Sequence, residues 1–222
     1  METYKNLVII GTSHISIESV KEVEYIIINK KPEIVAIELD RLRYKALTSE
    51  GRRVGIKDIK EIGIKGYLFG MFGAWIEKQL GKIVNVKPGS EMIKAIESAK
   101  KVDAKVALID QDIRITLKKI SKELTWKEKF NFVKDIFVGI FSKNKIKIDL
   151  RKVPDKKLIK ELVIKLKKDY PTLYKVLIEE RNQIIAKNLN KLMSTDKRIV
   201  AVIGAGHTDD VLDIIKNENK QN

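Results

Sequence analysis

Two stretches decide the fold: Val8-Ile9-Ile10-Gly11-Thr12-Ser13-His14 near the N-terminus, and Val200-Ala201-Val202-Ile203-Gly204-Ala205-Gly206-His207 near the C-terminus. Each is an apolar run followed by Gly-x-x-His, and they contain the only two histidines among 222 residues. A short apolar run rich in β-branched residues that stops at glycine is typical of a buried strand. In an open α/β sheet, the carboxyl edge is where sites are built. We therefore expect two imidazoles to share one rim of a sheet.

The segments between these two stretches predict an α/β fold. The first strand, over residues 6–10, is followed by a helical apolar stripe and then by a second strand at Ile34–Ile37, which makes a βαβ unit with parallel strands. Further strands are expected at Val106–Ile109 and at Ile199–Ile203. Together these elements predict a central, largely parallel sheet with flanking helices.

Four helical segments are expected around this sheet. Ser90 is predicted to cap a helix that runs from Met92 to Lys101, and residues 116–141 are predicted to be helical. Pro171 begins another helix that extends to Met193, and the apolar segment Tyr67–Leu80 is interpreted as a core helix rather than a groove wall.

The chain is expected to form a single domain over residues 1–222, with a mostly helical, basic insertion or subdomain at about 115–195. From Lys143 to Lys168 there are 11 basic and 3 acidic residues. An aromatic-rich stretch, Phe130 to Phe141, lies directly before this segment, and the combination favours docking at an anionic membrane surface.

The composition of the chain indicates which kinds of partner it can bind and where it is located. The net charge is +15, which suits an anionic partner, although a lysine-rich solvated surface explains it equally. There are 37 Lys and 8 Arg, and base-specific recognition relies on Arg, so no specific nucleic-acid binding is expected. The chain has no Cys, no apolar stretch long enough to span a bilayer and no visible export signal. We expect a cytoplasmic protein, peripheral to the membrane.

Polar residues follow every predicted strand, and they carry the candidate chemistry. His14, Glu38 with Asp40, Asp110 with Asp112, and His207 would all crowd one rim if the strands are parallel. Two histidines and one carboxylate are the ligand set of a hydrolytic divalent-metal site. The alternative is that both histidines cap turns and donate to backbone carbonyls. Four arginines in a lysine-dominated chain suggest bidentate pairing with carboxylates or with an anionic substrate group; they are Arg41, Arg43, Arg114 and Arg181.

The assembled motifs resemble the TraB/PrgY, or pheromone-shutdown, family, which is related to the Tiki metalloproteases. The matching stretches occur in the family's order: Ile10-Gly11-Thr12-Ser13-His14, Val35-Ala36-Ile37-Glu38-Leu39-Asp40, Pro88-Gly89-Ser90-Glu91-Met92, Asp110-Gln111-Asp112-Ile113-Arg114, Glu180-Arg181-Asn182 and Val202-Ile203-Gly204-Ala205-Gly206-His207. The resemblance implies a divalent metal (Zn, Mn or Co) held by His14, Glu38 and His207, with Glu91 as a further ligand or a base. Family members of the PrgY type continue into hydrophobic segments beyond the second Gly-x-x-His, and a chain extended in this way would be anchored in a membrane.

Together, these features predict a metal-dependent peptidase or peptide-inactivating protein that acts on a peptide or protein near a membrane. Glu91 or Glu38 would take a proton from water, and Arg43, Arg114 or Arg181 would hold a peptide carboxylate or stabilise developing negative charge. The alternative is a non-enzymatic module of the same fold that binds and sequesters peptides.

Overall fold

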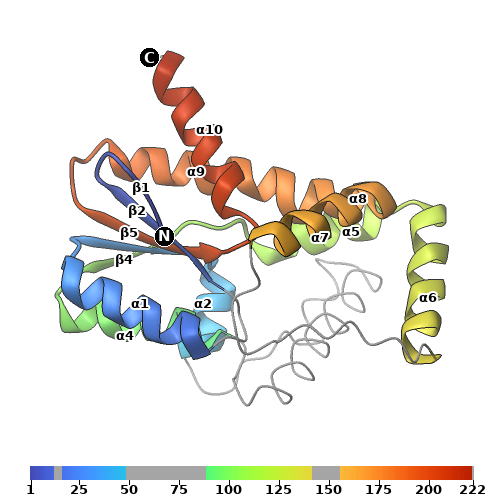
Figure 1. Ribbon diagram of the computed structural model, residues 1–222, viewed down its shortest axis with the longest axis horizontal. Coiled ribbons are helices and arrows are strands. Elements are labelled where there is room, and N and C mark those ends of the chain that lie inside the picture. The colour runs from blue at the N-terminus through green and yellow to red at the C-terminus, as the bar shows by residue number, and fades with distance from the viewer. Residues whose placement is uncertain (13–16, 49–88, 142–155, 222) are drawn as a thin grey trace.

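A five-stranded sheet runs through the centre of the computed structural model, which describes residues 1–12, 17–48, 89–141 and 156–221 (Figure 1). The strand order is β1-β2-β5-β3-β4. The strands are β1 (Glu2–Tyr4), β2 (Leu7–Thr12), β3 (Ile34–Ile37), β4 (Lys105–Leu108) and β5 (Ile199–Gly204). Only β1 is antiparallel to its neighbour; the other pairs are parallel. The predicted α/β class and largely parallel sheet are confirmed.

Helices cover both faces of this sheet (Figure 1). On one face lie α1 (Ile17–Lys30) and α4 (Ser90–Lys101), and on the other lie α9 (Glu180–Met193) and α10 (Thr208–Gln221). Each face of the sheet has its own hydrophobic core, and alternate residues of β5 belong to one core or the other. Val200 and Val202 pack toward α1 and α4, whereas Ala201 and Ile203 pack toward α9 and α10. A strand buried on both faces has no polar side, which explains its unbroken apolar sequence.

The remaining helices lie mostly between β4 and β5 in sequence. They are α5 (Ile113–Glu123), α6 (Trp126–Phe141), α7 (Lys156–Asp169) and α8 (Pro171–Tyr174), and α2 (Arg41–Thr48) follows β3. A π-helical turn, Lys175–Glu179, joins α8 to α9, so the chain is helical from Pro171 to Met193 as expected. In the described part of the chain, no helix has the length and apolarity that crossing a membrane requires.

One local prediction is confirmed with a refinement, and one is wrong. The segment 116–141 is helical as predicted, but it forms two helices, because a reciprocal cap starts a new helix at Trp126. The hydroxyl of Thr125 accepts from the backbone N–H of Glu128 at 3.2 Å, and the Glu128 carboxylate accepts from the backbone N–H of Thr125 at 3.0 Å. Ser90 does not cap α4; it lies inside the helix, and Gly89 precedes it at φ 82°, where glycine is favoured.

Several predictions concern residues outside the described ranges. They are the site residue His14, the core helix expected at Tyr67–Leu80, and the first part of the basic segment, residues 143–155.

Candidate functional site

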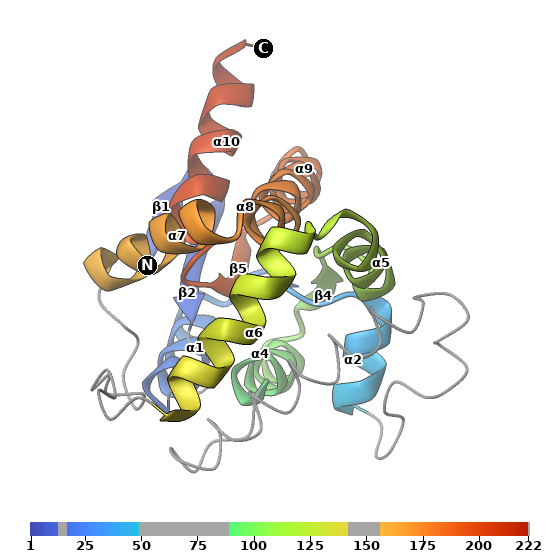
Figure 2. The same ribbon diagram turned by 90° about the vertical axis from the view of Figure 1, so that its right-hand side faces the viewer.

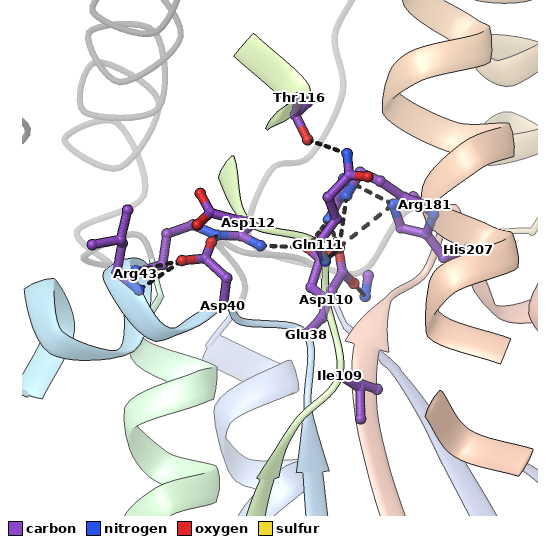
Figure 3. Close-up of polar contacts among 12 residues, drawn as sticks. Glu38, Asp40, Arg43, Ile109, Asp110, Gln111, Asp112, Thr116, Arg181 and His207 are labelled. Atoms are coloured by element: carbon purple, nitrogen blue, oxygen red, sulfur yellow. Dashed lines mark hydrogen bonds and ion pairs between the residues drawn. The ribbon is translucent and has the colours of Figure 1, made fainter. Parts of the chain in front are cut away.

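The carboxyl ends of the parallel strands meet at one rim, as the sequence predicted for the strands over 6–10, 34–37 and 199–203. Ile37 of β3 pairs with Val202 of β5 and with Leu108 of β4. Glu38, Ile109 and Ile203 follow directly, so the segments after these strands lie side by side (Figure 3). On the other side of β5, Thr12 pairs with Gly204, which brings the ends of both Gly-x-x-His strands together.

Arg181 lies at the centre of this rim and joins two buried carboxylates that come from different strand ends (Figure 3). Its Nε donates to Asp110 Oδ1 at 3.1 Å, and its Nη2 donates to Asp110 Oδ2 at 2.6 Å. The same Nη2 pairs with Glu38 Oε1. Its Nη1 donates to the carbonyl of Leu177, one helical turn earlier, which fixes the guanidinium against its own helix. The predicted pairing of Arg181 with carboxylates is thus present.

Arg43 approaches the same carboxylate from α2. Its Nε donates to Asp40 Oδ2 at 2.7 Å, and its Nη2 pairs with Asp110 Oδ2. Asp40 also accepts from the backbone N–H of Leu42 at 2.7 Å at the start of α2. Two guanidinium groups therefore meet three carboxylates that are almost fully buried, Glu38, Asp40 and Asp110.

The two guanidinium groups stay charged in this environment. Burial by itself lowers the pKa of Arg181, but the charge of Glu38 and the hydrogen bonds to Asp110 outweigh it and raise the pKa. For Arg43, burial also lowers the pKa, but the negative charge of Asp110 outweighs this effect, so the pKa of Arg43 is raised. Removing a group from this network would leave a buried charge without compensation.

Two hydrogen-bonded side chains, Asn182 and Asp210, orient the imidazole of His207. Asn182 Nδ2 donates to Asp210 Oδ2 at 3.1 Å, which turns the amide oxygen of Asn182 toward the imidazole. His207 Nδ1 lies 2.6 Å from that oxygen, so Nδ1 carries a ring proton and donates it. The other ring nitrogen, Nε2, lies 3.5 Å from Glu38 Oε1 and 3.4 Å from Arg181 Nη1. A carboxylate oxygen and an imidazole nitrogen thus lie near each other beside a cation.

The remaining predicted residues lie around this centre. Arg114 is half-exposed in the first turn of α5 and pairs with Asp112 at 2.7 Å, which lowers the pKa of that carboxyl through hydrogen bonds from Arg114. Glu91 is buried in the first turn of α4. Because α4 leads into β4 and packs along β3, this first turn is the end of the helix nearer the carboxyl rim.

The donor set tests whether the rim fits a metal. Among the described residues, no group of three or more His, Asp or Glu side chains is arranged so that it could hold a metal ion. His207 and Glu38 supply two donors of the types that zinc and related ions prefer, and Asn182 supplies the outer hydrogen bond that metal-binding histidines commonly make. The third predicted ligand, His14, lies two residues beyond the described end of β2. The residues present fit two positions of a site whose third position was predicted from sequence.

Sequence reasoning gave no role to Asn182 or Asp210, and it placed Asp110 at the rim without distinguishing it from Asp112. Asp110 carried a usable signal, because it directly follows a predicted strand. Asn182 was visible only as the neighbour of Arg181, and its contact with His207 joins residues 25 positions apart.

Comparison with known proteins agrees with these motifs. The uncharacterized protein MJ1365 of Methanocaldococcus jannaschii is 37% identical over 95% of this chain and 53% of its own length. TraB domain-containing proteins of mouse and human are 25% and 23% identical, over 90% of this chain and 60% of their own lengths. The chain thus spans a little over half the length of these relatives. Residues 2–221 match the TraB/PrgY/gumN family, and the chain belongs to it.

Proposed function

We propose that this chain carries the site of a divalent-metal-dependent peptidase or peptide-inactivating protein. The observation that carries the proposal is the pairing at the rim: His207 Nε2 lies 3.5 Å from Glu38 Oε1, and Asn182 holds the other ring nitrogen. Two such electron-pair donors attract a cation between them. The guanidinium of Arg181 already lies 3.4 Å from Nε2 and pairs with Glu38, so a positive charge is accommodated beside both groups.

The metal ligands in this proposal are His207, Glu38 and His14. If these residues held a divalent ion, the chemistry it would supply is polarisation of a carbonyl group and activation of water near neutral pH. Glu38 also accepts from the backbone N–H of Gly204 at 2.5 Å, so its second oxygen holds the carboxylate in place. Asn182 holds Nδ1, which leaves Nε2 as the ring nitrogen near Glu38.

The other side chains take roles that follow from their surroundings. Glu91 accepts the proton of the attacking water, as a buried carboxylate at the start of α4. Arg43 and Arg181 balance the charge of Asp110 and Glu38 and stay in the network. Arg114, at the half-exposed edge, is the arginine best placed to meet a carboxylate of the substrate.

A second candidate function rests on the same network. The carboxylates Glu38 and Asp110 are already compensated by two arginines and by the backbone of Gly204. A rim balanced in this way is stable without a metal, which favours a peptide-binding module that sequesters its ligand without cutting it.

A cleavage assay separates these candidates. The protein, loaded with Zn, Mn or Co, is incubated with a mixture of synthetic peptides, and the products are identified by mass spectrometry. We expect cleavage that stops with a chelator and falls by about 10²–10⁴-fold in Glu91→Gln, because a positioned base contributes about that much. The matched control is Glu97→Gln in the same helix, where the side chain is exposed and pairs with Lys94 at 3.1 Å. Binding of peptides without any cleavage, or cleavage that His207→Ala leaves unchanged, would favour the sequestering module.

The proposed site works near an anionic membrane surface, and α6 carries the features that favour this. Trp126 and Phe130 lie one helical turn apart, and their side chains are 79% and 73% exposed. Lys129 Nζ lies 4.7 Å from the centre of the Trp126 ring. In Figure 1, α6 stands out from the body of the protein on the side opposite α1. Aromatic rings flanked by lysines are typical of segments that rest in the headgroup region.

Vesicle co-sedimentation tests this surface. We expect binding to vesicles with anionic lipid at low salt, and weaker binding as salt rises, because each lysine near the surface contributes about 1 kcal/mol that salt screens. The double variant Trp126→Ser and Phe130→Ser should lower the partition coefficient by about tenfold or more, since two apolar rings no longer leave water. The control is Tyr25→Ser on α1, which removes a ring that is 69% exposed on the other side. Equal binding to neutral vesicles would contradict the proposal.

A further inference from the structure

A cavity of about 470 Å³ lies next to the rim, on the other side of the loop that carries His207. Its walls include the end of β2, the loop after β5, the first turn of α10 and α7, and these elements lie together in both views (Figures 1 and 2). Ala205, Gly206 and Thr208 line the cavity, whereas His207 between them turns its ring toward Asn182. The same short loop is therefore a wall of both the cavity and the site.

The floor of the cavity is apolar. One face of α7 contributes Ile159, Val163 and Ile164, and Tyr174 of α8 continues it. Two contacts hold α7 in place over the cavity: Lys160 Nζ lies 3.4 Å from Asp209 Oδ2, and Lys167 Nζ lies 5.0 Å from the centre of the Tyr174 ring. The volume is in the range of small ligand sites, which combine apolar walls with a few polar groups.

The wall formed by the loop after β5 and the start of α10 has two features that suit a ligand. One is open space, and the other is a hydroxyl group that can form a hydrogen bond. A Cβ built on Gly206 would meet no atom within 4 Å, so the space above this glycine is open. Thr208 is 6% exposed, and within the described ranges its Oγ1 makes no hydrogen bond. This hydroxyl lies against Gly11, where an added Cβ would be only 2.7 Å away, and both residues line the cavity. A hydroxyl donates and accepts, which matches a peptide amide.

We propose that this cavity is a subsite for an apolar segment of a peptide, seated next to the rim. The inference rests on the proposed function, since it names the part of the substrate that lies beside the proposed metal ligands. Charge distinguishes a peptide from an anionic lipid: the edge carries four carboxylates, Glu2, Glu22, Asp209 and Asp210, against the two lysines of α7. An anionic headgroup would be repelled there, whereas an apolar side chain with its uncharged backbone amides would be accepted.

Peptide binding to the metal-free protein tests the subsite independently of catalysis. The probes are a fluorescein-labelled nonapeptide with a central Phe-Leu pair and the same nonapeptide with Ser-Ser at those positions, titrated in the presence of EDTA and followed by anisotropy. The wild-type protein should bind the Phe-Leu peptide about tenfold more tightly or better, because a buried apolar side chain contributes at least that factor. Binding of both peptides within about twofold, or of neither, would overturn the subsite.

A matched pair of variants on α7 locates the binding. Ile164 lines the cavity and is 66% exposed, whereas Leu162 is 43% exposed and does not line it, so an aspartate at either position is tolerated by the fold. Ile164→Asp should abolish the preference for Phe-Leu, and Leu162→Asp should retain it. Gly206→Val fills the open space from the loop side and should act like Ile164→Asp. Equal losses in Ile164→Asp and Leu162→Asp would overturn the location.

The two proposals fail in different ways. A Phe-Leu preference in a protein that neither holds metal nor cleaves would overturn the peptidase and leave the subsite in place. Metal-dependent cleavage with no difference between the two peptides would overturn the subsite and leave the peptidase in place.

Discussion

Arg181→Met should lower the free energy of unfolding by about 3–5 kcal/mol, the usual cost of removing one partner from a buried ion pair. Arg181 is 14% exposed, and it binds Glu38 and Asp110, which are 3% and 0% exposed. Methionine keeps the length and apolar volume of the side chain but removes the charge and every donor. Arg43 still contacts Asp110, but Glu38 keeps only the N–H of Gly204 and its contact with His207 among the contacts described above.

Urea unfolding followed by circular dichroism measures this change. The matched control is Arg198→Met, because Arg198 is 66% exposed and pairs with Glu33 at 3.7 Å, so its loss should cost less than about 1 kcal/mol. Arg181→Lys should fall between the two, since an ammonium keeps the charge but loses the bidentate geometry with Asp110. Equal destabilisation by Arg181→Met and Arg198→Met would mean that the network contributes no more than a surface pair.

The core strands were predictable because each strand buried on both faces leaves a continuous apolar run. Residues 34–37 and the start of the last strand at Ile199 were predicted correctly, and the first long strand extends two residues further, to Thr12. The strand β1 was not predicted. It has three residues, none of them fully buried, and it exists only through its antiparallel pairing with β2. Such an edge strand carries no local pattern that distinguishes it from a loop.

The rim was predictable from one rule, that parallel strands present their carboxyl ends together. This rule placed Glu38 and His207 at a common edge, and both lie there. The rule could not distinguish Asp110 from Asp112. The first is fully buried between two arginines, whereas the second caps α5 and pairs with Arg114. Two residues of the same type, two positions apart, thus face different surroundings at the point where a strand turns into a helix.

The central position of Arg181 depends on tertiary structure that no local pattern reports. Arg181 and Asn182 lie one residue after the π-helical turn Lys175–Glu179, in the first turn of α9. A π turn contains an extra residue and rotates the side chains that follow it relative to a regular helix. The direction of these two side chains is therefore set by the packing of α8 and α9, and sequence spacing alone does not contain it.

The largest effect on metal affinity should come from the two histidines. If His14, Glu38 and His207 bind the metal, then His207→Ala and His14→Ala should each lose most of the bound Zn, Mn or Co and remain folded, because each variant removes a ligand without leaving a buried charge. Elemental analysis of the purified proteins and isothermal titration with each ion measure this loss. The double-histidine variant sets the background. A wild-type protein that binds none of the three ions more tightly than this variant contradicts the metal site and favours the sequestering module.

A graded series around Asn182 distinguishes a true metal site from non-specific binding. Asn182→Ala removes the acceptor that holds His207 Nδ1, and such outer hydrogen bonds typically contribute about 10–100-fold to metal affinity. The matched control is Asn188→Ala on the same helix, because Asn188 bonds only to the carbonyl of Ile109 among the contacts described and does not touch His207. The affinity for the metal ion should therefore fall in the order Asn188→Ala, Asn182→Ala, His207→Ala, with little change in the first.

The same titration assigns the role of Glu91. Glu91→Gln should retain the ion if Glu91 is the base and lose it if Glu91 is a ligand. Surface carboxylates that bind ions non-specifically would respond to none of these substitutions, since none of them alters the exposed acidic residues.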